Sequence, residues 1–237
     1  MGRRRKVVLA IALFSLVVVL ALVFWPRATC PEPVYKGRKL SDWLMRAAKK
    51  GQFSGEDTEA IQAIGVKGLP CYLEWMSYEP GALRRGQFQL AAGCEKVLHL
   101  DWVPESPEIT RAWFAFSAFC QLREDAAPTI PRLVSWATNL STLGSNFYSL
   151  PSQSAGAIEG LAAIGRPAVP AFISLVTNRD AGVRAFAISR SQRFHLYGDV
   201  ILELKKAQSD PDKNVRTAAT NALKAYDRNT SWLNIGL

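Results

Sequence analysis

Two short segments of closely similar sequence, one hundred residues apart, constrain this chain most. Ala-Ile-Gly-Val-Lys-Gly-Leu-Pro occupies residues 63–70, and Ala-Ile-Gly-Arg-Pro-Ala-Val-Pro occupies residues 163–170. A weaker copy at residues 126–131 again places a proline before an apolar run. Glycine commonly ends a helix, and proline is tolerated in the first turn of the next one because its missing N–H is not needed there. The repetition therefore predicts helical hairpins that stack on one another and share a core.

The composition agrees with a folded helical chain. Of 237 residues, 49% are hydrophobic and 21% are charged, which excludes a wholly disordered protein. Sixteen glycines, thirteen prolines and four cysteines are too few for a collagen-like chain or a disulfide scaffold.

A second motif opens two alanine-rich stretches. Asp-Ala-Gly-Val-Arg occupies residues 180–184, and Asp-Lys-Asn-Val-Arg occupies residues 212–216. We expect each aspartate to cap a helix and each arginine to return to the aspartate four residues before it. The second copy predicts a terminal helix at about residues 212–227.

Two further stretches have local patterns of their own. Ser41 is placed to cap a helix that ends at Lys49-Lys50-Gly51, with a cationic last turn and a glycine stop. Residues 95–107 contain His-Leu-Asp-Trp-Val-Pro-Glu-Ser-Pro, which predicts an irregular unit in place of a normal second helix.

The order of these motifs resembles the HEAT-repeat family: a first helix ending in Ile-Gly, a proline heading the second, then Asp-x-x-Val-Arg opening the next. The resemblance covers most of residues 56–227, and Tyr35 to Leu44 also looks like the lead-in of some bacterial members. It implies an all-α fold, a right-handed α-solenoid of HEAT-like hairpins over residues 40–230. Two departures are Pro80-Gly-Ala-Leu-Arg84 in place of Asp-Val-Arg, and only one proline interval near the family's period of about 40 residues.

The N-terminus predicts a membrane anchor. Residues 7–25 carry no charge, proline or glycine and follow a basic tail at residues 1–6. A helix of this length reaches about 28 Å, enough to span a bilayer. A cleaved signal peptide is the alternative, but no Ala-x-Ala site follows, and Cys30 lacks the context of a lipidated cysteine. We expect a signal anchor with a cytoplasmic tail, a linker at residues 26–39, and an extracytoplasmic repeat domain on a bacterial cytoplasmic membrane.

The net charge of +9 does not predict nucleic-acid binding. Five of the 29 basic residues and none of the 20 acidic ones precede residue 30, so the remainder carries 24 basic and 20 acidic residues. We interpret the basic excess largely as a topology feature, and expect no nucleic acid among the partners.

The chain lacks the usual catalytic motifs: a glycine-rich phosphate loop, a nucleophile elbow, His-Glu-x-x-His and Cys-x-x-Cys. His99 near Asp101 resembles a base with its orienting carboxylate, but we interpret it and His195 as structural residues. We therefore expect no catalytic, cofactor-binding or metal-binding residue, no small-molecule substrate, and no enzymatic activity.

Cysteines and tryptophans are interpreted as core residues. Cys71, Cys94 and Cys120 lie in apolar helical stretches, where free cysteine is a small buried hydrophobe. Oxidation is the alternative, and with Cys30 three full pairings are open. We expect five tryptophans to pack between hairpins: Trp43, Trp75, Trp102, Trp113 and Trp136.

The long polar stretch at residues 141–154 is the candidate binding loop. Phe147 and Tyr148 stand in it, and either contact a partner or fold back onto the repeat domain. The expected function is a membrane-tethered scaffold that binds another protein. Alternatives are a HEAT-like enzyme or accessory, similar to bilin lyases or DNA-base glycosylases, and a secreted solenoid whose signal has been removed.

Overall fold

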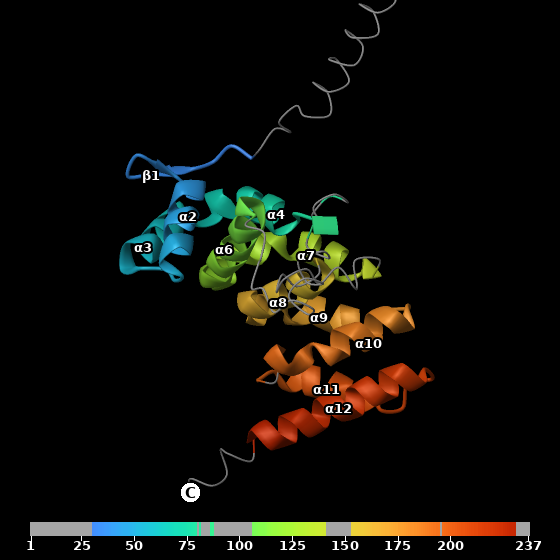
Figure 1. Cartoon of the computed structure of the whole chain (residues 1–237). Helices are drawn as coiled ribbons and strands as arrows, with labels where there is room; N and C mark the ends of the chain where they lie inside the picture. The colour runs from blue at the N-terminus through green and yellow to red at the C-terminus, as the bar shows by residue number, and fades with distance from the viewer. Residues whose placement is uncertain are drawn as a thin grey trace, which may run out of the picture. The chain divides into compact units, whose positions relative to one another are not determined.

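The computed structural model describes residues 30–79, 81, 86–87, 106–140, 153–194 and 196–230, and this part is mostly α-helical (Figure 1). Within the expected linker, residues 34–39 form a small antiparallel hairpin in which β1 (Val34–Tyr35) pairs with β2 (Arg38–Lys39). Gly37 in the turn has a φ of 74°, a conformation that favours glycine. The described end of the linker is therefore a defined structure.

The helices follow in chain order. The α-helices are α2 (Leu40–Lys50), α3 (Gly55–Ile64), α4 (Leu69–Met76), α6 (Pro107–Leu122), α7 (Ile130–Ala137), α8 (Gln153–Ile164), α9 (Val169–Val176), α10 (Ala181–Ser189), α11 (Gly198–Ala207) and α12 (Lys213–Thr230). Short 3₁₀ segments connect them: η1 (Gly65–Gly68), η2 (Arg123–Thr129), η4 (Arg166–Ala168) and η5 (Ser191–Phe194).

The predicted glycine and proline turns are confirmed. Gly65 and Gly165 follow the last residues of α3 and α8 with φ values of 52° and 83°. Pro70 and Pro170 lie in the first turns of α4 and α9. In the weaker third copy Arg123 takes the same backbone conformation, with a φ of 50°, where the other copies have glycine. The connection of this copy, η2, is also longer than η1 and η4, so both its length and its lack of glycine set it apart from the other two.

The helices from α6 onward pack in two rows. In one row α6 contacts α8 and α10 contacts α12, whereas in the other α7 contacts α9 and α9 contacts α11. Contacts between the rows, such as α7 with α8 and α11 with α12, enclose the core (Figure 1). At the N-terminal end α2, α3 and α4 pack against α6. The described helices from α6 onward therefore share a core.

Three of the expected core tryptophans are buried, and one is not. Trp43, Trp75 and Trp136 are at most 6% exposed. Trp113 is 45% exposed, so its prediction is wrong. The buried face of α6 runs through Ala112 and Ala115, and Trp113 lies about 100° around the helix from Ala112. Trp102 lies outside the described residues.

Two helix ends differ from the sequence prediction. Ser41 does not cap α2, because the helix begins one residue earlier, at Leu40, and Lys39 takes the N-cap position. The hairpin delivers the chain to that point: the Leu40 N–H donates to the Pro33 carbonyl over 3.0 Å. The cationic end of α2 and its stop at Gly51, with a φ of 72°, are confirmed. The terminal helix α12 is confirmed and extends to Thr230.

The cysteines differ from the expected free thiols. Cys71 is buried, but it forms a disulfide with Cys30. A buried cysteine in an apolar stretch looks the same in sequence whether or not its partner lies nearby. Cys120 is a free, half-buried thiol, and burial together with the charge of Glu159 raises its pKa to about 12. Cys94 lies outside the described residues.

The expected anchor at residues 7–25 and the expected C-terminal tail at residues 231–237 lie outside the described residues. Of the irregular unit expected at residues 95–107, residues 95–105 also lie outside them, whereas Ser106 is the N-cap and Pro107 the first residue of α6. Among the helices that the structure describes, none combines the length and the apolar character that a bilayer crossing needs.

Candidate partner-binding groove

Two loops with the same hydrogen-bond pattern organise the C-terminal half. In the loop before α10, Asn178 Oδ1 accepts a hydrogen bond from the Asp180 N–H over 2.9 Å. In the loop before α12, Asp210 Oδ1 accepts one from the Asp212 N–H over 2.9 Å. Asp180 and Asp212 then each accept from two N–H groups in the first turn of the following helix. The predicted aspartate caps are confirmed.

The expected return of each arginine to its own aspartate is wrong. Arg184 instead donates from Nη1 to the carbonyls of Asn178 and Arg179, over 2.9 and 3.0 Å. Its Nε and Nη2 donate to the two carboxylate oxygens of Asp210, over 2.9 and 2.8 Å. The capping aspartate already accepts the helix N–H groups, so the guanidinium is available for the neighbouring loop.

The arginine that follows the second loop repeats the hydrogen bonds to the carbonyls of its own loop. Arg216 Nη1 donates to the carbonyls of Asp210 and Pro211, over 2.7 and 2.9 Å. The Asp210 carboxylate therefore accepts hydrogen bonds from Arg184, and the Asp210 backbone carbonyl accepts one from Arg216. The hydrogen bonds from Arg184 hold the pKa of the Asp210 carboxyl below its usual value. These bonds tie the α9–α10 loop to the α11–α12 loop.

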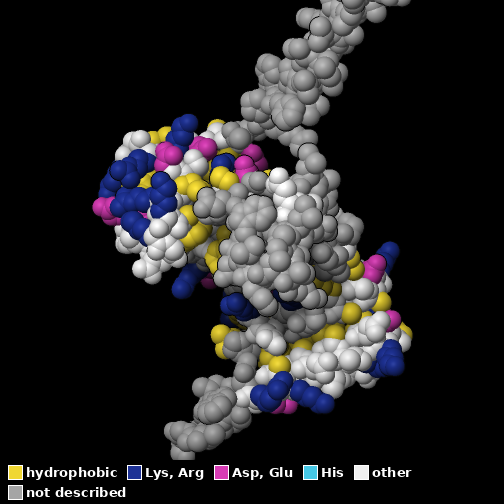
Figure 2. Space-filling view, viewed as in Figure 1, with side chains coloured by type: hydrophobic (Ala, Val, Ile, Leu, Met, Phe, Trp, Pro, Cys, Tyr) yellow, Lys and Arg dark blue, Asp and Glu magenta, His cyan; other side chains and the backbone are white. Residues whose placement is uncertain are grey.

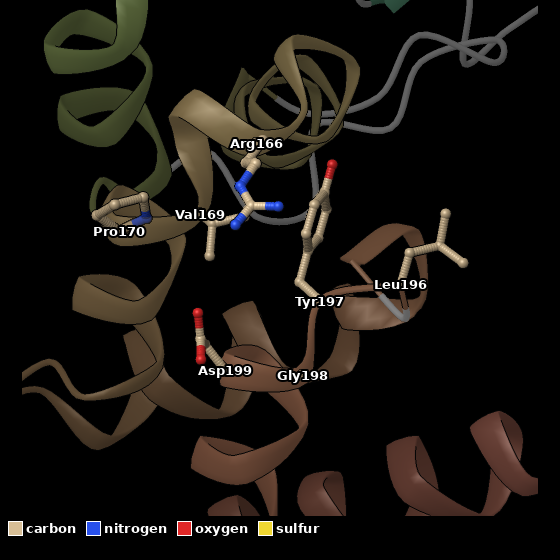
Figure 3. Close-up of a pocket in the computed structure, with 7 residues that line it drawn as sticks. All are labelled: Arg166, Val169, Pro170, Leu196, Tyr197, Gly198 and Asp199. Carbon is tan, nitrogen blue, oxygen red and sulfur yellow. The ribbon is translucent and has the colours of Figure 1, made fainter.

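Helices α9 and α11 lie side by side, and a pocket opens at each end of the pair. The first, of about 220 Å³, is lined by Arg166, Val169, Pro170, Leu196, Tyr197, Gly198 and Asp199 (Figure 3). The second, of about 380 Å³, is lined by Val176, Thr177, Asn178, Arg184, Glu203, Lys206, Ala207, Asp210 and Pro211. The beginnings of both helices meet at the first pocket and their ends at the second, so the helices run parallel. We name this surface, with its two pockets, the α9–α11 groove.

Polar groups from different elements meet in the first pocket. Figure 3 shows the Arg166 guanidinium and the Asp199 carboxylate pointing into the space between α9 and α11, with the Tyr197 ring beside them. A Cβ at residue 165 would lie 3.3 Å from the Tyr197 hydroxyl oxygen, so Gly165 leaves room for that ring. The pocket can therefore donate and accept hydrogen bonds beside apolar carbon from Val169.

Between the pockets, one face of α11 forms a ridge. Asp199, Leu202, Glu203 and Lys206 are spaced by three and four residues and so lie on one side of the helix. Leu202 is 53% exposed, and Leu196 at the first pocket is 77% exposed. Exposed leucines beside pockets are a feature of surfaces that a protein partner covers.

Charge and size limit what the groove can bind. Its lining contains three basic and three acidic side chains: Arg166, Arg184, Lys206, Asp199, Glu203 and Asp210. A polyanion such as nucleic acid gains little from a surface with this balance. Pockets of 220 and 380 Å³ are at or below the lower end of the range for small-molecule sites, and suit individual side chains of a peptide. Within the described residues no cluster of three or more His, Cys, Asp or Glu side chains is suited to a metal ion.

The residues singled out from sequence are not among those that form the groove. Phe147, Tyr148, His99, Asp101 and His195 all lie outside the described residues. The groove leucines were missed because isolated leucines are common in helices. Leu202 does stand off the buried positions of α11, Val200, Leu204 and Ala207, and this offset is the pattern that could have found it.

Comparisons of the chain with protein-family models, curated proteins and solved structures find no match. The HEAT-repeat resemblance therefore depends on the sequence motifs alone.

Proposed function

We propose that the protein is a membrane-tethered scaffold. Residues 7–25 anchor an α-solenoid of HEAT-like hairpins at the outer face of a bacterial cytoplasmic membrane, and the α9–α11 groove binds a segment of another protein. The observation that carries the proposal is the groove itself, which has two side-chain-sized pockets beside α11, the helix that also exposes Leu202. Leucine exposed beside pockets is an apolar anchor point for a peptide.

Two features support the solenoid. The Asn178–Arg184 and Asp210–Arg216 loops repeat one hydrogen-bond pattern, as stacked copies of a single unit do. The last helix, α12, buries one face and presents a polar outer face to solvent, as a terminal repeat does. That outer face consists of Asn214, Thr217, Asn221, Lys224 and Arg228.

The disulfide between Cys30 and Cys71 supports the proposed compartment. Structural disulfides persist in oxidising compartments and are rare in the cytoplasm of mesophiles. Cys30 is only five residues beyond the expected span, so the bond ties the repeat domain to the chain next to the membrane. An extracytoplasmic repeat domain has no access to chromosomal DNA, which disfavours the glycosylase-like alternative.

Photo-crosslinking in intact cells tests the groove. A photoreactive residue at position 202 is expected to give one discrete crosslinked product, whereas the same residue at position 221 on the outer face of α12 gives none. Both positions are exposed, so the comparison separates the groove from general surface. Leu196→Asp or Asp199→Lys, each added to the chain with the photoreactive residue at position 202, should abolish the crosslinked product without altering the thermal unfolding temperature. Equal products from positions 202 and 221 would contradict the groove assignment.

A topology experiment tests the tether separately. Cys94 and Cys120 are replaced by serine, the Cys30–Cys71 disulfide is kept, and one reporter cysteine is placed at position 228. A membrane-impermeant maleimide is expected to label the reporter on intact cells. If the maleimide labels the reporter only after the cells are lysed, the domain lies in the cytoplasm and the proposal is contradicted.

A further inference from the structure

A basic surface lies at the N-terminal end of the repeat domain. Residues 34–50 contain six lysines and arginines and a single acidic residue, Asp42. The six are Lys36, Arg38, Lys39, Arg46, Lys49 and Lys50. All are exposed except Arg46, which is half-buried. Lys and Arg side chains gather at this end of the molecule in Figure 2. We name these six residues the α2 basic surface.

The surface has a regular geometry. Arg46 follows Lys39 by seven residues and precedes Lys49 and Lys50 by three and four, so these four side chains follow one side of α2. Arg38 and Arg46 both place their guanidinium carbon near the buried Trp43 ring, at 5.4 and 5.3 Å from its centroid. The hairpin and the helix therefore present their charges together.

The charges of this surface are only partly neutralised. Lys36 pairs with Glu59 over 3.0 Å, Arg46 pairs with Glu56 and Asp57, and Lys50 lies 3.5 Å from Asp57. Within the described part of the chain, no ion pair involves the other three: Arg38, Lys39 and Lys49. Cations without a carboxylate partner remain free to attract an anionic surface.

We propose that the α2 basic surface binds the anionic phospholipid headgroups of the membrane that holds the tether. This inference depends on the proposed tether. The five residues from Trp25 to Cys30 reach at most about 18 Å, and the disulfide joins Cys30 to the repeat domain. In sequence, the first residue of this surface, Lys36, follows the expected span by eleven positions, and clustered lysines and arginines beside a span are attracted to anionic lipid. Lipid is favoured over an acidic protein because the proposed tether supplies the lipid before any partner arrives.

Lysine footprinting of the full-length protein tests the proposal. The chain is incorporated into nanodiscs of phosphatidylcholine, or of phosphatidylcholine with phosphatidylglycerol, and acetylated briefly for mass spectrometry. Lys39 and Lys49 are expected to react at least about threefold more slowly in the anionic discs at low salt, and the difference should shrink as salt screens the attraction. Lys205 and Lys213, exposed at the other end of the domain, serve as internal controls.

A matched pair of variants assigns the effect to this surface. Lys39→Gln with Lys49→Gln should remove the lipid-dependent protection of Lys36 and Lys50, whereas Lys205→Gln with Lys213→Gln should leave it intact. Equal labelling in both kinds of disc would overturn the inference. Protection that appears only in native membranes, and not in the anionic discs, would assign the surface to a protein and also overturn it. Failure of the chain to enter any disc would instead contradict the tether.

Discussion

Each end of the described domain has an aspartate that pairs with basic side chains: Asp57 at the N-terminal end and Asp210 at the C-terminal end. The two differ in how far along the chain their basic partners lie. Asp57 is fully buried and accepts a hydrogen bond from the Ser54 N–H over 2.9 Å and another from the Ser54 hydroxyl. Its cations, Arg46 and Lys50, come from the preceding helix. Asp210 accepts hydrogen bonds from Arg184 of α10, which lies 26 residues earlier in the chain.

The difference shows two ways of joining helices with the same chemistry. At the N-terminal end the carboxylate completes a cap within one hairpin, and the disulfide supplies the long-range link. At the C-terminal end a guanidinium connects α10 to the loop between α11 and α12, with no disulfide among the described residues. The two ends should therefore respond differently to reduction, substitution and acid.

Removing the disulfide should have the largest effect and should act on the N-terminal end. Cys30→Ser opens a loop of about 40 residues and is expected to lower the free energy of unfolding by about 4 kcal/mol. Urea denaturation measures the loss, and dithiothreitol should reproduce it in the wild-type protein. Cys120→Ser, which removes the half-buried free thiol, is the control. Because this variant keeps the disulfide, dithiothreitol should lower its free energy of unfolding by the same amount as in the wild-type protein. Unchanged stability after Cys30→Ser would contradict a structural role for the bond.

Asp57→Asn should come next. The substitution leaves Arg46 and Lys50 without their buried carboxylate and weakens the hydrogen bonds at Ser54, so we expect a loss of about 3 kcal/mol. Asp42→Asn, at an exposed position near the start of α2, is the matched control and should cost less than about 1 kcal/mol. Similar losses from both variants, measured by urea denaturation, would mean that burial of Asp57 is not the cause.

Arg184 and Arg216 offer a direct comparison within the C-terminal end. Both bind the carbonyls before their helix, but only Arg184 also donates hydrogen bonds to the Asp210 carboxylate among the described contacts. Arg184→Met is expected to cost about 2 kcal/mol and Arg216→Met about 1 kcal/mol. A double-mutant cycle of Arg184→Met with Asp210→Asn should give a coupling energy of about 1 kcal/mol. A coupling near zero would show that the ion pair adds nothing to the carbonyl contacts.

The smallest effect should be the pH dependence of stability. Burial raises the pKa of Asp57, but the hydrogen bonds from Ser54 and the charges of Lys50 and Arg46 outweigh it, so the pKa lies below the usual value. The pKa of Asp210 is also lowered, by hydrogen bonds from Arg184. A lowered folded-state pKa means that both carboxylates stabilise the fold fully above the unfolded pKa of about 4.

This stabilisation should disappear as the pH falls below that value toward the folded-state pKa values. Urea midpoints between neutral and acidic pH measure the slope. Asp210→Asn should flatten part of it, and Asp57→Asn another part, because each variant removes one titrating carboxylate. Asp199→Asn changes an exposed carboxylate of the groove and tests whether any lost charge has the same effect. A slope unaltered by both Asp57→Asn and Asp210→Asn would contradict the assigned causes.

Sequence alone was sufficient for local features of the fold. The glycines at 65 and 165, the prolines at 70 and 170 and the caps at Asp180 and Asp212 follow from hydrogen bonds and backbone angles within a turn or two. The candidate site was not predictable in the same way. Its leucines, Leu196 and Leu202, show their exposure only once α11 packs beside α9.

The amino-acid sequence by itself determined the helix ends at Gly51, Gly65 and Gly165 and the helix starts at Asp180 and Asp212, because those choices depend on residues close together in the chain. Only the tertiary structure decided that Arg184 binds Asp210, that Cys71 bonds to Cys30, and that α9 and α11 form a groove. Partners far apart in sequence are selected by the way helices stack, and several partners of the right chemistry compete until that stacking brings one within hydrogen-bond distance.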